Sequence, residues 1–130
     1  MTKPFKRILI TGAAGRLGTE MRRGLVPLAD KLVLADRVGC KDLLEHEEEL
    51  VFDLADEAAT IAATEGCDAI VHLGGASVER PWEDVLDSSI RGSYHIYEGA
   101  RKHGVKRVIY SSSVHAIGVD FHPEVTRVAA

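Results

Sequence analysis

The stretch RILITGAAGRLGTE, residues 7–20, decides the fold of this chain. An apolar run ends at Thr11 and gives way to a turn with three glycines, after which apolar residues recur at helical spacing. This order predicts a strand, a glycine turn and the N-terminus of a helix. The first amides of a helix lack partners in their own turn and lie at the positive end of its dipole, so the turn is suited to hold a phosphate group.

Each glycine of this turn has its own predicted role. Gly12 permits the tight turn, Gly15 leaves the backbone bare for a pyrophosphate, and Gly18 allows close packing of the helix. The same glycines also fit a turn that binds no ligand. We favour a dinucleotide site, because the glycines separate a strand from a helix and an acidic residue, Asp36, follows downstream.

Length and composition indicate a single globular domain. The chain has 130 residues, 45% hydrophobic and 28% charged, which is short for an enzyme with a separate substrate lobe. The net charge of -4 offers no basic face, so nucleic acid is not an expected partner. We expect a cytoplasmic protein, since no apolar stretch approaches the roughly 20 residues that span a bilayer and no signal sequence precedes the first strand. Cys40 and Cys67 lack the spacing of a zinc site or a disulfide framework, and no metal is expected.

Periodicity along the rest of the chain predicts an α/β fold. We expect helices over residues 15–26, 57–64 and 82–104, and further strands over 31–35, 50–53, 68–73 and 105–110. The interpretation is a Rossmann-type doubly wound parallel sheet with strand order 3-2-1-4-5 in three α/β/α layers, in one domain spanning residues 1–130.

Three side-chain sets receive structural interpretations. Leu17, Met21 and Leu25 recur every four residues and are expected to face the sheet. A stripe from Trp82 to Ala100 on the long helix is assigned to the core or to an interface. Residues 41–49, KDLLEHEEE, are interpreted as a solvated acidic stretch.

Ligand-binding side chains are expected where the strands end. In dinucleotide folds an acidic residue at the position of Asp36 accepts hydrogen bonds from ribose hydroxyls, although it also fits a plain strand terminus. Its charge repels a 2′-phosphate and favours NAD over NADP, while neighbouring Arg37 would tolerate some NADP. Gly74 and Gly75 allow a ligand to approach the backbone. His72 is interpreted as a hydrogen-bonded strand histidine.

Several segments together resemble the uronate dehydrogenases, which belong to the extended short-chain dehydrogenase/reductase superfamily. These segments are TGAAGRLG, LAD, FDLAD, VHLGGASVERPWE, YEGARKHG and RVIYSSSVHAIG. The resemblance implies oxidation of a hexuronic acid at C1 to an aldarolactone, with NAD as cofactor and a homo-oligomer formed through the long helix. A nucleotide-sugar epimerase or dehydratase of the same superfamily and a non-catalytic NAD(H)-responsive regulator are the alternatives.

The resemblance also implies roles for single residues. Cofactor contacts would come from Gly12, Ala14, Gly15, Arg16, Leu17, Gly18, Asp36, Asp53, Leu54, Leu73, Gly74 and Gly75. Asp53 and Leu54 would border the adenine, although Asp53 fits equally well as a turn or capping residue. Ser77 and His115 match positions that contact the sugar acid, and Ser113 matches the catalytic serine.

The sequence departs from the family pattern at three places. No YxxxK pair, which carries the proton-transfer tyrosine and lysine in the family, occurs within the 130 residues. We therefore expect the N-terminal portion of a longer enzyme, truncated before the YxxxK helix and the substrate lobe and inactive alone. Val114 and Ser89 each stand where the family usually has asparagine, which puts substrate choice and rate in doubt.

Overall fold

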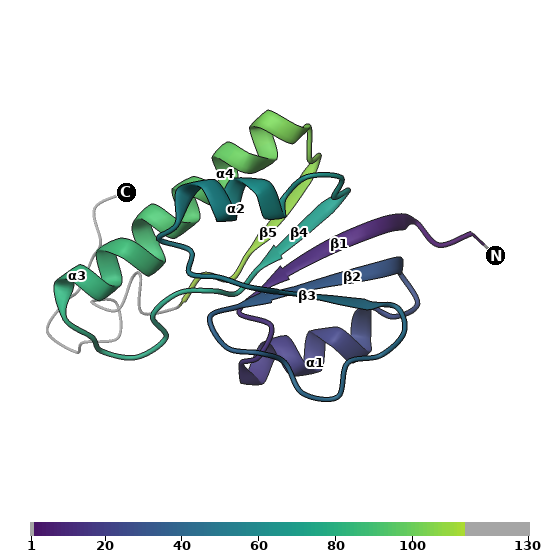
Figure 1. Cartoon of the computed structure of the whole chain (residues 1–130), viewed down its shortest axis with the longest axis horizontal. Coiled ribbons are helices and arrows are strands. Elements are labelled where there is room, and N and C mark those ends of the chain that lie inside the picture. Colours follow the sequence, from purple (N-terminus) through teal and green to yellow (C-terminus); the bar gives the residue numbers. More distant parts are fainter. Residues whose placement is uncertain (1, 114–130) are drawn as a thin grey trace, which may run out of the picture.

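The computed structural model describes residues 2–113, and these form a five-stranded parallel sheet with helices on both faces (Figure 1). The strands are β1 (Phe5–Thr11), β2 (Ala29–Asp36), β3 (Glu47–Val51), β4 (Ala69–His72) and β5 (Arg107–Tyr110). The order β3-β2-β1-β4-β5 confirms the predicted doubly wound topology. Strand order reverses between β1 and β4, and doubly wound folds bind ligands at the carboxyl ends of the strands at such a point.

The helices form the two outer layers. They are α1 (Arg16–Leu25), α2 (Glu57–Ala63), α3 (Trp82–Val85), the π-helix η1 (Leu86–Arg91) and α4 (Gly92–His103). Helix α1 covers one face, whereas α2 and α4 lie side by side on the other (Figure 1). The chain therefore has the three layers that the sequence predicts.

Alternate residues of β1 supply the cores on both faces of the sheet. Ile8 and Ile10 pack on the side of α1, where Met21 and Leu25 cover them. Leu9 points to the opposite face and packs in the cluster that contains Ile96 of α4. A strand covered on both faces needs apolar residues at successive positions, which explains the unbroken apolar run before the glycine turn.

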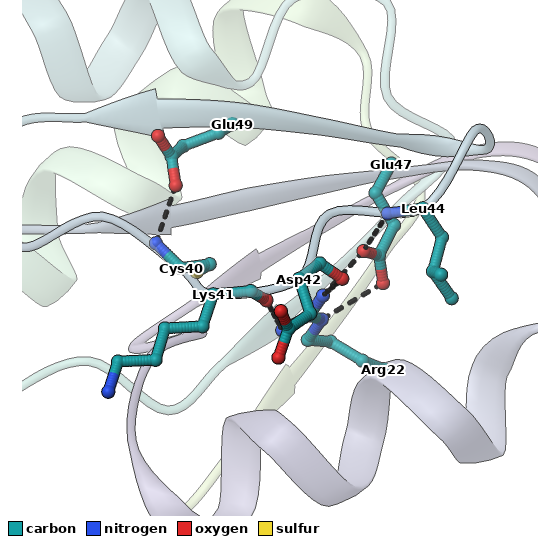
Figure 2. A network of polar contacts seen from close by, with 7 residues as sticks. All are labelled: Arg22, Cys40, Lys41, Asp42, Leu44, Glu47 and Glu49. Carbon is teal, nitrogen blue, oxygen red and sulfur yellow. Dashed lines mark hydrogen bonds and ion pairs between the residues drawn. The ribbon is translucent and has the colours of Figure 1, made fainter.

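The acidic residues at the start of β3 correct one prediction. Strand β3 begins at Glu47, earlier than expected, and this carboxylate accepts hydrogen bonds from Arg22 Nε at 2.9 Å and Nη2 at 2.6 Å (Figure 2). The Glu47 side chain is 1% exposed and that of Arg22 is 13% exposed. Arg22 also donates to the carbonyls of Lys41 and Asp42 at 3.0 and 3.1 Å. Through these contacts Arg22 of α1 binds the segment from residue 41 to residue 47. Residues 41–49 are therefore not only a solvated acidic surface.

The stripe on the long helix, which the sequence assigns to the core or to an interface, does not lie in the core. Trp82, Ile90, Tyr94 and Tyr97 are 60%, 50%, 62% and 47% exposed, and only Ala100 of the stripe is buried. The π-helix η1 interrupts the α-helical repeat, because its wider turn shifts every later residue around the axis. The buried face of α4 is made instead by Gly92, His95, Ile96, Gly99 and Ala100.

A smaller correction concerns α1. Met21 and Leu25 pack against the core as predicted, but Leu17 is 57% exposed. Leu17 lies in the first turn of the helix, beyond the cover of the sheet, and it faces the cavity described below.

Candidate nucleotide-binding site

A cavity of about 510 Å³ lies at the carboxyl ends of β1, β2 and β4. The predicted residues that line it are Gly12, Gly15, Arg16, Leu17, Gly18, Asp36, Asp53, Leu54, Leu73, Gly74, Gly75 and Ser77. Residues far apart in the sequence therefore share one hollow at the reversal of strand order, where the topology predicts a ligand.

Two glycines shape the wall of this cavity by close backbone contact. Gly12 has φ +67°, and a Cβ atom there would lie 2.9 Å from the amide nitrogen of Gly74 and 2.9 Å from the carbonyl carbon of Leu73. At Gly18 a Cβ atom would lie 2.4 Å from the Gly12 carbonyl oxygen and 2.6 Å from Ala13 Cα. The turn role of Gly12 and the packing role of Gly18 thus have direct structural causes.

Gly15 differs from its two neighbours in the motif. It is the N-cap residue of α1 with φ -75° and ψ 177°, a conformation open to any amino acid. A Cβ atom there would meet only the Gly12 carbonyl oxygen, at 3.2 Å. The backbone dihedral angles of Gly15 therefore do not require glycine, although a Cβ atom would make a tight contact with that oxygen. Within residues 2–113 no side chain caps the N-terminus of α1, and the first turn of this helix has no acidic residue. The positive end of the helix dipole therefore faces the cavity without a competing anion from the first turn.

Asp36 connects the end of β2 to the glycine turn. Its Oδ2 accepts a hydrogen bond from the Ala14 amide at 3.0 Å, and its Oδ1 accepts one from the Arg37 amide at 2.7 Å. Ala14 thus supports the site through its N–H group, although its side chain is not among the described lining residues. The carboxylate is held at the cavity wall in a fixed orientation.

Asp53 has the turn role that the sequence left open, together with a place in the cavity. Its Oδ1 accepts a hydrogen bond from the Ala55 amide at 2.9 Å, and its Oδ2 lies 4.0 Å from Arg37 Nη1. Arg37 and Asp53 both line the cavity beside Asp36. The guanidinium that could tolerate a 2′-phosphate therefore has a carboxylate next to it.

His72 is a buried strand histidine, as predicted. It is 1% exposed, with Nδ1 2.6 Å from Thr11 Oγ1 and Nε2 3.0 Å from Ser93 Oγ. Burial lowers the pKa of this imidazole from 6.5 to about 4, so it is neutral at physiological pH.

The predicted catalytic and substrate residues fall in different places. Ser77 lines the cavity, whereas Ser113 is exposed and is not one of the described lining residues. Val114 and His115 lie outside the described residues. Ser89 lies in η1, and its hydroxyl oxygen accepts a hydrogen bond from the Ala76 amide at 2.9 Å.

Some lining residues were not singled out from the sequence. Thr11 belongs to the site although it reads as the last residue of a strand, and a hydroxyl at such a strand end was the available signal. Arg80, Asp84 and Asp87 reach the cavity from the segment after the glycine pair, where the sequence indicates only the start of a helix. In residues 2–113 no group of His, Cys, Asp and Glu is arranged to hold a metal ion.

Residues 8–129 match the model of the NAD dependent epimerase/dehydratase family. The chain belongs to this family. Epimerase/dehydratase family members that resemble it include curated uronate dehydrogenases, 53% identical over 116 residues in Pseudomonas syringae pv. tomato and 48% identical over 123 residues in Agrobacterium fabrum. These matches cover 88% and 95% of the chain, but the chain spans only 42% and 46% of the two enzymes.

Solved structures of this family have the same arrangement. A mutant of uronate dehydrogenase from Agrobacterium tumefaciens, complexed with NAD, matches with a TM-score of 0.80 and 50% identity over 83% of the chain and 41% of that protein. Glucuronic acid dehydrogenase from Chromohalobacter salexigens matches with a TM-score of 0.82 and 45% identity over 85% of the chain and 42% of that protein. The expected resemblance to uronate dehydrogenases is confirmed, and the predicted cofactor is the one in the family's description.

Proposed function

We propose that this chain is the NAD-binding part of an oxidoreductase that oxidises a hexuronic acid. The carrying observation is the start of α1 at Gly15, where the first helix amides face the cavity beside a backbone without a side chain, although the dihedral angles of Gly15 do not themselves require glycine. A dinucleotide pyrophosphate explains both the bare backbone and the position at the positive end of the helix. The identity of about half to uronate dehydrogenases supports the substrate class.

The residues of the cavity divide among the parts of the cofactor in this proposal. The pyrophosphate contacts the glycine turn, the ribose of the adenosine contacts Asp36, and the adenine lies beside Asp53 and Leu54. Leu73 and Gly74 follow the cofactor toward its nicotinamide end. The carboxylate of Asp36, already oriented by the Ala14 amide, favours NAD over NADP because it repels a 2′-phosphate.

The sugar acid is placed beside the nicotinamide end. Ser77 lines the cavity there, and His115 and Ser113 remain proposals on the strength of the resemblance. Bound NAD would supply the hydride acceptor for oxidation at C1 of the hexuronic acid, giving an aldarolactone. We assign proton transfer to a tyrosine and a lysine in a further part of a longer protein, so the 130-residue chain is expected to bind NAD without turnover.

The exposed stripe on α3, η1 and α4 provides the surface for assembly in this proposal. Trp82, Ile90, Tyr94 and Tyr97 are 47% to 62% exposed and follow one another along these helices. Isolated apolar residues are ordinary on a surface, but a run of aromatic side chains is typical of an interface. We propose that the longer protein forms a homo-oligomer here.

Calorimetric titration of NAD into the chain tests the proposal with a matched pair of glycine variants. Gly15→Val places side-chain atoms where the pyrophosphate is expected, and we predict binding weakened at least about tenfold. Gly24→Ala is the control, because a Cβ atom at Gly24 meets nothing within 4 Å and Gly24 is not among the described lining residues.

Binding experiments test the position of the cofactor, and turnover experiments test the reaction and its substrate. Equal heats for the unsubstituted chain and Gly15→Val would overturn the assigned pyrophosphate position. NADH formation from glucuronate or galacturonate by the 130-residue chain, followed by absorbance at the NADH band, would contradict the assignment of proton transfer to a further part. Turnover of a UDP-sugar by the longer protein in place of free uronates would favour an epimerase or dehydratase.

A further inference from the structure

A row of hydrogen bonds begins at the loop that follows β4. The hydroxyl oxygen of Thr11 accepts hydrogen bonds from the amides of Leu73 at 3.2 Å and Gly74 at 3.0 Å. The same oxygen lies 2.6 Å from His72 Nδ1. Thr11 and His72 are both 1% exposed, so water is excluded from these groups and each must find its partners within the protein.

The protons of this row can be arranged in one consistent direction. The Thr11 hydroxyl already accepts two amide hydrogens, so its own single proton is directed to His72 Nδ1. A neutral imidazole that accepts at Nδ1 carries its proton at Nε2, and this N–H donates to Ser93 Oγ at 3.0 Å. The Ser93 hydroxyl then donates to the carbonyl oxygen of Ser89 at 2.6 Å. Each side-chain donor in the row has one acceptor, and the Leu73 amide is shared between the Thr11 hydroxyl and the Thr11 carbonyl oxygen at 3.2 Å.

The row of hydrogen bonds ends at Ser89 in the π-helix η1, and the same residue also binds the loop after β4 directly. The Ala76 amide donates to Ser89 Oγ at 2.9 Å, so Ser89 contacts the end of the loop from 73 to 76 directly. It is linked to the start of the loop only through the row of hydrogen bonds described above. Between them Gly75 has φ +147°, and a Cβ atom there would lie 3.1 Å from Ser89 Oγ. All four loop residues line the cavity.

We propose that His72 is a positioning residue for the cofactor. In its Nε2–H form it joins Thr11 to Ser93, and this fixes the loop from 73 to 76 against η1 in the shape that receives the dinucleotide. The inference rests on the proposed function, because the loop is assigned to the cofactor there. A role in stability alone would leave NAD affinity unchanged in every variant that folds.

Two variants of Thr11, together with a control at Thr64, distinguish a positioning role from a role in stability alone. Thr11→Val keeps the shape of the side chain but removes the hydroxyl. We expect NAD to bind about tenfold more weakly, because the Gly74 amide and His72 lose their partner while the Leu73 amide keeps only the Thr11 carbonyl. Thr11→Ser keeps the hydroxyl and is expected to recover most of the affinity. Calorimetry is performed on the 130-residue chain at a temperature where near-ultraviolet circular dichroism shows each variant folded.

Thr64→Val is the matched control. Thr64 is also fully buried, and its hydroxyl also contacts a histidine, with Oγ1 2.8 Å from His103 Nδ1. It lies between α2 and α4 and is not among the described lining residues. We expect Thr64→Val to unfold at a lower temperature than the unsubstituted chain while binding NAD with the same affinity.

The tautomer of His72 provides a readout that does not depend on NAD. Two-bond ¹H–¹⁵N correlation spectra are expected to show a protonated Nε2 and an unprotonated Nδ1. Should Thr11→Val not fold, Ser93→Ala replaces it, with affinity expected to fall about threefold and to return in Ser93→Thr.

The results distinguish the two proposals. No NAD binding by the unsubstituted chain overturns the proposed function and this inference together. Normal binding by that chain with equal affinity in Thr11→Val, or in Ser93→Ala if it is used, overturns the positioning role alone. A proton at Nδ1 of His72 also overturns it, because the direction of the row would then be reversed.

Discussion

Two parts of the molecule reverse the usual relation between residue type and burial. At β3 the carboxylate of Glu47 is 1% exposed, whereas on α3, η1 and α4 the apolar side chains of Trp82 and Tyr94 are 60% and 62% exposed. The carboxylate can be buried because Arg22 supplies two hydrogen bonds and the opposite charge. Tyr94 is exposed because the π-helix before it shifts its direction around the helix axis, whereas Trp82 begins α3, ahead of that turn. At these two places the available hydrogen-bond partner and the direction in which the helix points a side chain decide burial more than hydropathy does.

Breaking the buried ion pair at β3 should have the largest effect. Glu47→Gln leaves Arg22 enclosed without its counter-charge, and we expect the free energy of unfolding to fall by about 3 kcal/mol. Urea denaturation measures the loss. Glu98→Gln is the control, since Glu98 pairs with Arg101 on the exposed side of α4. A loss for Glu47→Gln no larger than for this control would contradict the comparison.

As pH falls, the buried histidine and the buried carboxylate should lower the free energy of unfolding in two different pH ranges. The folded pKa of His72, about 4, lies below its ordinary 6.5, so the unfolded chain takes up this proton first and stability falls as pH decreases from 6.5 toward 4. We expect His72 to account for a loss of about 2 kcal/mol at pH 5 relative to pH 8. His72→Gln should lack that part of the decrease in urea titrations at the two pH values.

Glu47 should respond in a lower pH range. The hydrogen bonds and charge of Arg22 lower the pKa of this carboxyl below its ordinary 4.5, so its stabilisation is complete above 4.5 and is lost as pH falls further. Glu47→Gln should therefore flatten the pH dependence of unfolding below 4.5 and leave the range from 6.5 to 5 unaltered. A flattened upper range would contradict the assignment to His72.

A partly exposed ion pair between β1 and β3 should have a smaller effect. Glu48 lies 2.9 Å from Arg7, with side chains 37% and 27% exposed. Because solvent screens this pair, Glu48→Gln should cost at most about 1 kcal/mol. The cost should shrink further in about 1 M salt, where charges are screened within roughly 3 Å. Denaturation at low and high salt checks both statements.

The smallest effect is expected on the exposed stripe. Tyr94→Ser should change the free energy of unfolding by no more than about 0.5 kcal/mol in dilute solution. Ile96→Ala, two residues later and 0% exposed, should cost about 3 kcal/mol. A large loss for Tyr94→Ser would show that the stripe is covered in solution, and sedimentation analysis would then identify an assembly.

Most of the candidate site could be predicted because its signals are local. The glycine turn must follow a strand and begin a helix, and Asp36 must end the next strand, so their positions follow from periodicity and backbone conformation. Thr11 could not be assigned its role in this way. The contacts of its hydroxyl depend on His72 of β4, and through His72 on Ser93 of α4, and both residues are distant from Thr11 in the sequence.

By itself the sequence determined the strand–turn–helix unit, the parallel sheet and the place where the strand ends converge. These depend on apolar spacing and on conformations that few residues besides glycine adopt. Only the tertiary structure decided that the Glu47 side chain is buried, that Tyr94 is exposed and that His72 lies between Thr11 of β1 and Ser93 of α4. Burial and hydrogen bonding depend on which distant groups meet, and one wider helical turn is enough to change which side chains do.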